Sequence, residues 1–157
     1  MIKEKSSKGR FFEDYQLGEV IYHATPRTMT DGDRSIYIGV YSSRFASYCS
    51  SKFAKRIGFK GFPIEDLAVF HMVFGKTVPD ISFNAIANLG YAEVKFFEPV
   101  FPGDTITSES KIIGLKENSS GRSGIVYVET KGFNQNNRLI IKFIRWVMIR
   151  KNSCKPL

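Results

Sequence analysis

The chain has 157 residues and a formal net charge of +8, with 43% hydrophobic, 14% aromatic and 24% charged residues. This length suits one domain with a single hydrophobic core, and the composition argues against an intrinsically disordered or membrane-spanning protein. Cys49 and Cys154 form neither a metal-ligand spacing nor a disulfide framework, so we expect no metal and a reducing, cytoplasmic location. The first five residues also lack the apolar region of a secretory signal.

The excess positive charge is concentrated at the two ends of the chain. Residues 1–10 hold four basic residues and one acid, and residues 150–157 hold three basic residues and no acid, which leaves the body at only +2. A nucleic-acid-binding domain would instead gather Lys and Arg along one element and interleave them with stacking aromatic residues. We therefore expect solvated basic ends and no nucleic acid as a partner.

Residues 1–10 are polar and predict a flexible basic leader, followed by one domain at 11–151 and a short tail at 152–157. Residues 19–28 alternate in polarity, which predicts a strand. A helix is then predicted to start at Thr30, because its hydroxyl can cap the first free amides and the acids that follow suit the first turn. This helix is expected to end near Val40.

Two more helices are predicted before the chain turns to strands. A short one covers residues 51–57, with Gly58 as its stop, and a third runs from Asp66 to Phe74, closed by Gly75. The third helix is apolar around almost its whole circumference. Other structure must therefore surround it.

Four long strands are predicted next, over residues 84–98, 105–116, 123–133 and 139–149. Residues typical of turns separate them, including Pro102-Gly103-Asp104 and two runs rich in Asn and Ser. Strands joined by tight turns pair antiparallel, and such a sheet has one face to bury. Wrapping the sheet around the apolar helix buries both, so the pattern predicts an α+β protein with a hot-dog fold.

A turn in the middle of the chain resembles the signature of MaoC-type hydratases. It reads Pro99-Val100-Phe101-Pro102-Gly103-Asp104-Thr105, at the end of a strand. The resemblance covers residues 11–151. Further segments are similar to the N-terminal half of the mesaconyl-CoA hydratases, also called β-methylmalyl-CoA dehydratases; these are residues 9–15, 23–28, 43–46 and, as the longest, 66–93.

This resemblance implies a hot-dog fold, an acyl-CoA thioester as substrate, and reversible addition of water across an α,β-double bond. It implies no metal and no nicotinamide or flavin cofactor. Enzymes of the mesaconyl type resemble two fused MaoC modules, whereas this chain has the length of one. We therefore expect a homodimer, or a heterodimer with another MaoC-like chain, formed by edge-to-edge pairing of the sheets, and no association with a membrane.

Hydration of an enoyl thioester needs a base that activates water and hydrogen-bond donors for the charge on the thioester oxygen. The resemblance implies an Asp and a His, five positions apart, before the short second helix; the matching positions here are Ser43 and Tyr48. Neither is a base near neutral pH, because a serine hydroxyl hardly ionises and tyrosine titrates near pH ~10. The usual dyad is therefore replaced in this chain.

The same spacing occurs later, at Asp66 and His71, which we take as the candidate catalytic pair. Five residues of a regular helix turn by about 500°, so the two side chains share a site only if Asp66 lies at the helix cap. The alternative is that Asp66 only caps the helix and His71 is a satisfied core or interface histidine. Glu65 is a third candidate base, and His23, within a strand, is expected to face solvent.

Other residues are candidates for binding the substrate. The free amides at the start of the apolar helix suit the thioester oxygen, and the family's glycine there is matched by Leu67. Arg44 presents a planar fork for a substrate carboxylate, with Tyr41, Ser43 and Tyr48 as possible helpers; a surface ion pair is the alternative.

Weaker candidates lie further along the chain. Asn84 and Asn88 alternate on one face of the predicted strand and are candidate hydrogen-bond donors to the substrate. Lys76, Lys95 and Arg145 either meet the phosphates of CoA or belong to a solvated face.

Three functions are compatible with these residues. The leading one is a MaoC-type hydratase/dehydratase, a hydro-lyase, acting on a short acyl-CoA that bears a carboxylate, such as mesaconyl-CoA. The second is a non-catalytic acyl-CoA-binding subunit that completes a heterodimer. The third is an acyl-CoA thioesterase in which Asp66 or Glu65 activates water.

Overall fold

The computed structural model describes residues 9–153 of the chain. The predicted leader falls mainly on residues 1–8 and the predicted tail partly on residues 154–157, and both stretches lie outside the described residues. Within residues 9–153, no helix combines the length and the apolar character that crossing a membrane requires.

Five antiparallel strands form one sheet in the order β1-β3-β4-β5-β2, so β1 and β2 are its edges. Their bounds are β1 Val20–Thr28, β2 Ala85–Phe96, β3 Thr105–Glu117, β4 Ser123–Phe133 and β5 Leu139–Arg150. All five agree with the predicted strands to within two residues. The agreement follows from the turn residues, which fix where each strand must stop.

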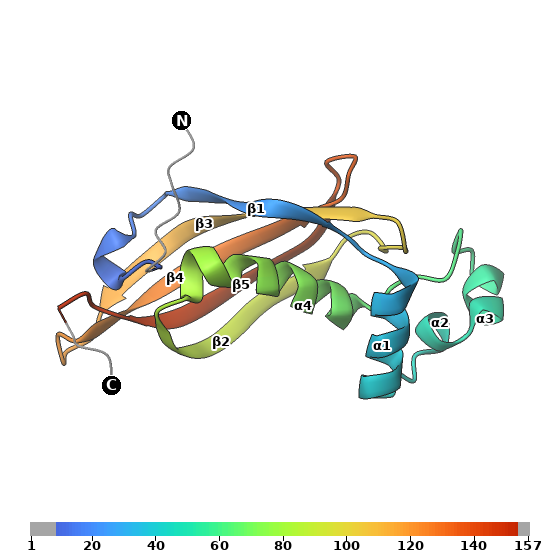
Figure 1. Cartoon of the computed structure of the whole chain (residues 1–157), viewed down its shortest axis with the longest axis horizontal. Helices are drawn as coiled ribbons and strands as arrows, with labels where there is room; N and C mark the ends of the chain where they lie inside the picture. The colour runs from blue at the N-terminus through green and yellow to red at the C-terminus, as the bar shows by residue number, and fades with distance from the viewer. Residues whose placement is uncertain (1–8, 154–157) are drawn as a thin grey trace.

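The helix α4 (Asp66–Thr77) lies across one face of this sheet (Figure 1). Its buried residues Ala68, Val69 and Val73 join the larger core cluster, to which β5 contributes Ile141 and Phe143. The sheet thus covers one side of α4, while Leu67 on the same helix stays 52% exposed, so the predicted enclosure of the helix is incomplete. This is the helix on which the candidate site is built.

The end of α4 differs from the prediction that Gly75 closes the helix. α4 continues through Gly75 to Thr77, and a π-helical segment, η2 (Val78–Ser82), follows directly. Gly75 does not adopt the left-handed conformation that makes glycine a helix stop. The chain changes to π spacing around Pro79, which has no amide to donate to the α-helical ladder.

Three shorter helices gather beyond one end of the sheet (Figure 1): α1 Asp31–Tyr41, α2 Ala46–Cys49 and α3 Ser51–Arg56. α1 starts at the predicted cap, where the Asp33 amide donates to Thr30 Oγ1 at 3.1 Å and the Thr30 amide donates to Asp33 Oδ2 at 2.9 Å. α2 is a single turn without a capping side chain, so no signal in the sequence predicted it.

The first described residues pack at the opposite end of the sheet. Arg10 forms a two-pronged ion pair with Glu19, at 3.0 and 2.6 Å. The Tyr15 hydroxyl donates to the carbonyl of Ile81 at 2.6 Å, and both residues belong to a second core cluster with residues of β3, β4 and β5. Packed structure therefore begins before residue 11, ahead of the expected domain boundary.

Candidate active site

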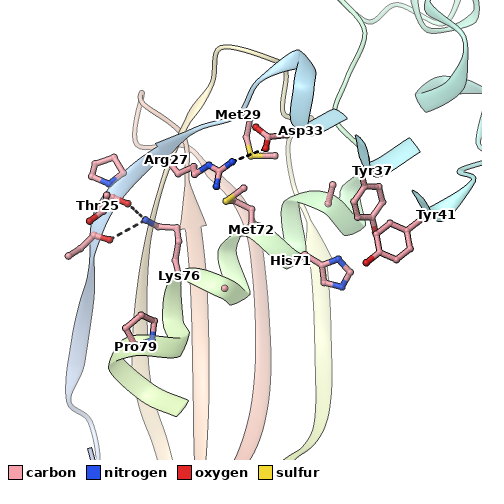
Figure 2. Close-up of a pocket in the computed structure, with 14 residues that line it drawn as sticks. Thr25, Arg27, Met29, Asp33, Tyr37, Tyr41, His71, Met72, Lys76 and Pro79 are labelled. Atoms are coloured by element: carbon pink, nitrogen blue, oxygen red, sulfur yellow. Dashed lines mark hydrogen bonds and ion pairs between the residues drawn. The ribbon is translucent and has the colours of Figure 1, made fainter. Parts of the chain in front are cut away.

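A pocket of about 710 Å³ opens between β1, α1 and α4 (Figure 2). This volume lies in the range of sites that hold small molecules. Met29, Ala68 and Met72 give its middle an apolar surface, and polar side chains lie toward its two ends. A ligand with an apolar body and polar groups at both ends matches this distribution.

One end of the pocket is built on an irregular stretch of β1. The register of β1 with β3 shifts between residues 23 and 27, and Thr25 in this bulge has a left-handed φ of 68°. Lys76, in the last turn of α4, donates to the carbonyl of Ala24 at 3.3 Å and to that of Thr25. Figure 2 shows this lysine reaching across from α4 to the bulge.

A second cation lines the same end. The Arg27 guanidinium pairs with Asp33 of α1 at 2.7 Å, and 51% of the Arg27 side chain stays exposed. Burial raises the pKa of Asp33, but the hydrogen bonds that Asp33 accepts from Thr30 and the charge of Arg27 together hold this pKa below its usual value. The pair therefore stays charged at neutral pH and fastens α1 to β1.

The other end of the pocket is aromatic. The ring centroids of Tyr37 and Tyr41 lie 4.5 Å apart, and the His71 ring lies 6.0 Å from Tyr37 and 6.2 Å from Tyr41. Burial raises the pKa of Tyr37, and the charge of Glu65 raises it further. His71 supplies an imidazole to the pocket wall, and a positioned imidazole is a common general acid or base.

A second group of polar residues lies at the N-terminus of α4. The Tyr48 hydroxyl lies beside Asp66, whose carboxylate and backbone both shift the pKa of the phenol. Burial, more than anything else, raises the pKa of Tyr48, and the charges of Asp66 and Glu65 add to this effect. Glu65 Oε2 and, in the loop after α1, Ser43 Oγ are buried without a hydrogen-bond partner among the described residues.

The structure places Asp66 and His71 in different surroundings. Glu65 is the cap of α4 and Asp66 its first residue, so the condition for a shared site, Asp66 at the cap, is not met. Asp66 contacts Tyr48, whereas His71 lines the pocket. Among the hydrogen bonds and ion pairs of residues 9–153, none joins the two.

The start of α4 nevertheless offers free amides beside the pocket. No side chain caps the helix, and the amide of Val69 makes the first described intrahelical bond, to the carbonyl of Glu65 at 3.1 Å. The amides of Leu67 and Ala68 precede it and have no intrahelical acceptor. Ala68 lines the pocket, and the Leu67 side chain is 52% exposed.

The remaining substrate-binding candidates are scattered. Tyr41 lines the pocket, and Arg44 is exposed in the loop after α1 and is not part of the wall. Asn84 is buried ahead of β2, where its side-chain amide donates to the carbonyl of Arg10 at 3.2 Å. Asn88 lies on β2 and accepts from a guanidinium nitrogen at 3.5 Å. Neither asparagine lines the pocket.

The suggestion that Arg145 meets CoA phosphates is wrong, because this residue has no exposed surface. It donates to Thr77 Oγ1 at 3.0 Å, and its guanidinium lies 4.8 Å from the centroid of the Phe74 ring. Thr77 ends α4, so the cation sits under the negative end of the helix dipole. Burial lowers the pKa of Arg145 to about 10.

The expectation that His23 faces solvent is also wrong. Its side chain is fully buried, and its Nδ1 and Nε2 atoms lie 2.8 Å from Asp80 Oδ2 and Ser110 Oγ. The apolar character of Val20 and Tyr22 makes their face of the strand look like the buried one. Tyr22 is in fact 76% exposed, and it is the face of His23 that turns inward.

Sequence reasoning missed several residues of the pocket, chiefly Arg27, Asp33, Tyr37 and Met72. One available signal was the spacing of Tyr37 and Tyr41, four residues apart on a predicted helix and hence on one face. Arg27 and Met72 gave no local signal. Within residues 9–153, no three His, Cys, Asp or Glu side chains gather in a way that would hold a metal ion.

Comparison with known proteins agrees with this architecture. A family model described as mesaconyl-CoA hydratase matches residues 2–155. A mesaconyl-CoA hydratase from Cereibacter sphaeroides is 55% identical over 149 residues, which are 95% of this chain and 43% of that protein. The chain thus spans less than half the length of this relative.

Solved structures show the same relation. A MaoC domain protein dehydratase from Chloroflexus aurantiacus superposes with a TM-score of 0.91 at 53% identity, covering 97% of this chain and 44% of that one. A Mycobacterium tuberculosis protein with a double hot-dog fold has a TM-score of 0.87 at 23% identity, covering 97% and 48%. The predicted hot-dog fold is thereby confirmed, and the chain belongs to the mesaconyl-CoA hydratase family of MaoC-like proteins.

Proposed function

We propose that the chain is a hydratase/dehydratase module for a short acyl-CoA of the mesaconyl-CoA or β-methylmalyl-CoA type. The observation that carries this proposal is the pocket of about 710 Å³ that has His71 in its wall and adjoins the uncapped start of α4. The activity named for the relative from Cereibacter sphaeroides supports the substrate class.

In the proposed reaction the thioester oxygen points at the amides of Leu67 and Ala68. His71 takes a proton from water while the oxygen of that water bonds to the β-carbon. The amides and the positive end of the helix dipole stabilise the negative charge that develops on the thioester oxygen. The proton then goes to the α-carbon, and the reverse sequence expels water. This proton chemistry needs no resident cofactor, so we propose none.

We assign the second proton-handling group to Asp66, with Glu65 as the alternative. Asp66 lies beside Tyr48, and the charge of Glu65 raises the pKa of Tyr37 in the pocket wall. Either carboxylate can balance the positive charge that His71 acquires during the reaction. Substituting each of them separately distinguishes the two assignments.

The free carboxylate of a mesaconyl group needs a cationic partner. Arg44 is our candidate from the sequence, and Arg27 is a second one because its half-exposed guanidinium lines the pocket. A guanidinium binds a carboxylate through two parallel hydrogen bonds, which also fixes its orientation. Both residues stay within our proposal until their variants are compared.

We propose that the module works beside a second MaoC-like module, in a homodimer or a heterodimer. The edge strand β2 carries exposed apolar side chains, among them Ile86, Tyr91 and Val94, which suit the edge of a second sheet. The match covers only 43% of the relative from Cereibacter sphaeroides, which leaves room in that protein for a second module. The free thiol of Cys49 supports a reducing location such as the cytoplasm.

The test is a spectrophotometric assay of the purified chain with mesaconyl-CoA and β-methylmalyl-CoA, combined with detection of the intact product. We expect loss or gain of the conjugated double bond with the thioester intact. The assay is run with the chain alone and with a second MaoC-like module. If neither substrate is converted under either condition, the proposal is wrong.

A non-catalytic acyl-CoA-binding subunit is the second candidate, because Ser43 and Tyr48 stand where the resemblance predicts the usual dyad. In that case His71→Ala leaves the rate of the assembled complex unchanged while thioester binding persists. A thioesterase, with Asp66 or Glu65 activating water, is distinguished by the release of free CoA.

A further inference from the structure

The pocket wall formed by β1 is a strained and externally supported piece of backbone. Ala24, Thr25 and Pro26 lie in the bulge where the register with β3 shifts, and all three line the pocket. Thr25 is a β-branched residue with a left-handed φ, which is unfavourable. Such a conformation persists only where the surrounding structure determines it, and it is most frequent at functional sites.

On the pocket side of the bulge, Lys76 provides this support. Its ammonium group donates to the carbonyls of Ala24 and Thr25, which lie in the stretch where the register with β3 shifts. These hydrogen bonds fasten the bulge to the last turn of α4. They hold its carbonyls but do not fix how far β1 lies from the segment that follows α4.

On the buried side, His23 makes that second connection. It directly precedes the bulge, and its Nδ1 atom lies 2.8 Å from Oδ2 of Asp80. Asp80 directly follows Pro79, which faces the bulge across the pocket. The His23–Asp80 pair therefore ties the two walls together just beneath this end of the pocket.

The remaining contacts of His23 anchor the pair to the sheet. Its Nε2 atom lies 2.8 Å from Oγ of Ser110 on β3, and that hydroxyl lies 2.8 Å from Oγ1 of Thr130 on β4. Both ring nitrogens of the buried imidazole are satisfied, as a buried polar network requires. Asp80 belongs to η2, and π-helical turns are frequent at functional sites.

We propose that His23 and Asp80 are positioning residues that set the separation between the β1 bulge and η2 and thereby decide which acyl groups the pocket accepts. The inference rests on the proposed function for the identity of the ligand. With the tie intact the pocket is narrow at this end and selects a short, branched acyl group. When the tie is lost, the strained bulge relaxes outward and longer acyl chains enter.

The experiment measures the dissociation constants of mesaconyl-CoA and trans-2-octenoyl-CoA by calorimetry and takes their ratio. The wild-type chain is expected to prefer mesaconyl-CoA. His23→Gln and Asp80→Asn each reduce this preference about tenfold, which is what a change of one or two methylene groups in pocket size produces. The double variant reduces it no further than either single variant, because the two residues act as one unit.

Ser110→Ala is the matched control. It removes a buried hydrogen bond from the same network and lowers the melting temperature, but it leaves the tie between the walls in place. Its ratio of the two dissociation constants is expected to stay within about twofold of the wild-type ratio, because the substitution does not touch the pocket. Asp80→Asn preserves the shape of the side chain and so gives a second folded variant if His23→Gln does not fold.

Three results overturn the inference: a wild-type chain without preference, a preference unchanged in both single variants, or an equal shift in Ser110→Ala. Turnover of mesaconyl-CoA is measured in parallel. Altered selectivity without any turnover contradicts the proposed function alone. Turnover with unaltered selectivity contradicts only the role of His23 and Asp80.

Discussion

Tyr48 lies beside Asp66 at the start of α4, close enough that both the carboxylate and the backbone of Asp66 shift the pKa of the phenol. Because burial and two neighbouring acids raise the pKa of Tyr48, the phenol keeps its proton over the whole range in which an enzyme is assayed. Tyr48 is therefore a hydrogen-bond donor to the carboxylate and not a base. Its place beside the start of α4 makes it an orienting group for Asp66.

Tyr48→Phe removes this orientation and leaves the ring. We expect kcat to fall about tenfold, because a carboxylate that loses its fixed position is misaligned for proton transfer. The free energy of unfolding should change by only about 1 kcal/mol, the value of one hydrogen bond. Tyr22→Phe is the control, since Tyr22 is exposed on β1 and does not line the pocket. Equal losses of activity in both variants would contradict the assignment.

Three substitutions test which residue acts as the catalytic base. His71→Ala should lower kcat by about 10²–10⁴, the usual contribution of a positioned acid or base. Asp66→Asn and Glu65→Gln each remove a charge and keep the size of the side chain. We expect the larger fall in kcat with Asp66→Asn. The measurement is the initial rate with mesaconyl-CoA. A rate that survives His71→Ala unchanged removes His71 from the mechanism.

The carboxylate anchor is identified by comparing Arg44→Met and Arg27→Met. Each variant is assayed with mesaconyl-CoA and with 2-methylcrotonyl-CoA, which has a methyl group in place of the carboxylate. Substituting the true anchor should lower kcat/KM about tenfold or more for mesaconyl-CoA and leave it unchanged for 2-methylcrotonyl-CoA, as expected for the loss of a hydrogen bond to a charged group. The other arginine serves as the control. If neither variant discriminates, the carboxylate is bound elsewhere.

Arg145 carries a charge in the core that burial makes unfavourable. Its native pKa of about 10 lies below its ordinary value of 12.5. Below pH 10 both the native and the unfolded chain hold the proton, so the native state bears the full free-energy cost of burying the charge. Between about pH 10 and 12.5 the native chain loses the proton before the unfolded chain does, and this cost is relieved. Arg145→Met should therefore raise the free energy of unfolding at pH 7, by about 1–3 kcal/mol.

Urea unfolding at pH 7 and pH 11 measures this difference in the free energy of unfolding, which should narrow at pH 11, where the native chain has lost the proton. Lys142→Met is the matched control on the same strand. Lys142 is a partly exposed residue paired with Glu129 at 2.7 Å, and such a surface pair contributes little to stability. A less stable Arg145→Met would mean that the dipole of α4 and the Thr77 hydroxyl outweigh the burial of the charge.

Two glycines near α4 should respond in opposite directions to alanine. At Gly132 a Cβ would lie 2.8 Å from Ile141 and 2.9 Å from Val73, so Gly132→Ala should destabilise the fold by about 1–3 kcal/mol. At Gly75 nothing lies within 4 Å, and alanine favours a helix interior by about 1 kcal/mol. Thermal unfolding of the two variants tests this, and a loss of stability in Gly75→Ala would contradict it.

The strands and the central helix were predictable because their signals are local. Turn residues mark every strand end, and an apolar circumference on the helix requires a surrounding sheet. The cap of α1 at Thr30 was equally visible. The extension of α4 past Gly75 was not, because glycine stops a helix only if it adopts the left-handed conformation, and here the tertiary structure favours continuation.

The candidate site was less predictable, since its geometry depends on which strand face is buried. On the edge strand β1 either face carries side chains that could be buried. The apolar character of Val20 and Tyr22 favours their face, whereas the structure buries the face of His23. The burial of His23 and Arg145 depends on partners 57 or more residues away in the sequence. No spacing rule reveals such partners, whereas His71 stood out as the one polar interruption of an apolar helix.

The two edges of the sheet differ in their capacity to accept another strand. At β1, Pro26 has no amide to donate, and the carbonyls of Ala24 and Thr25 are already bound to Lys76. At β2 the strand is long and carries no proline. Of the two edges, β2 can therefore pair with a further strand along its length, whereas β1 is obstructed at its bulge. If two modules pair through their β2 edges, as we propose, only the two obstructed β1 edges stay free, and the sheet does not continue into a fibre.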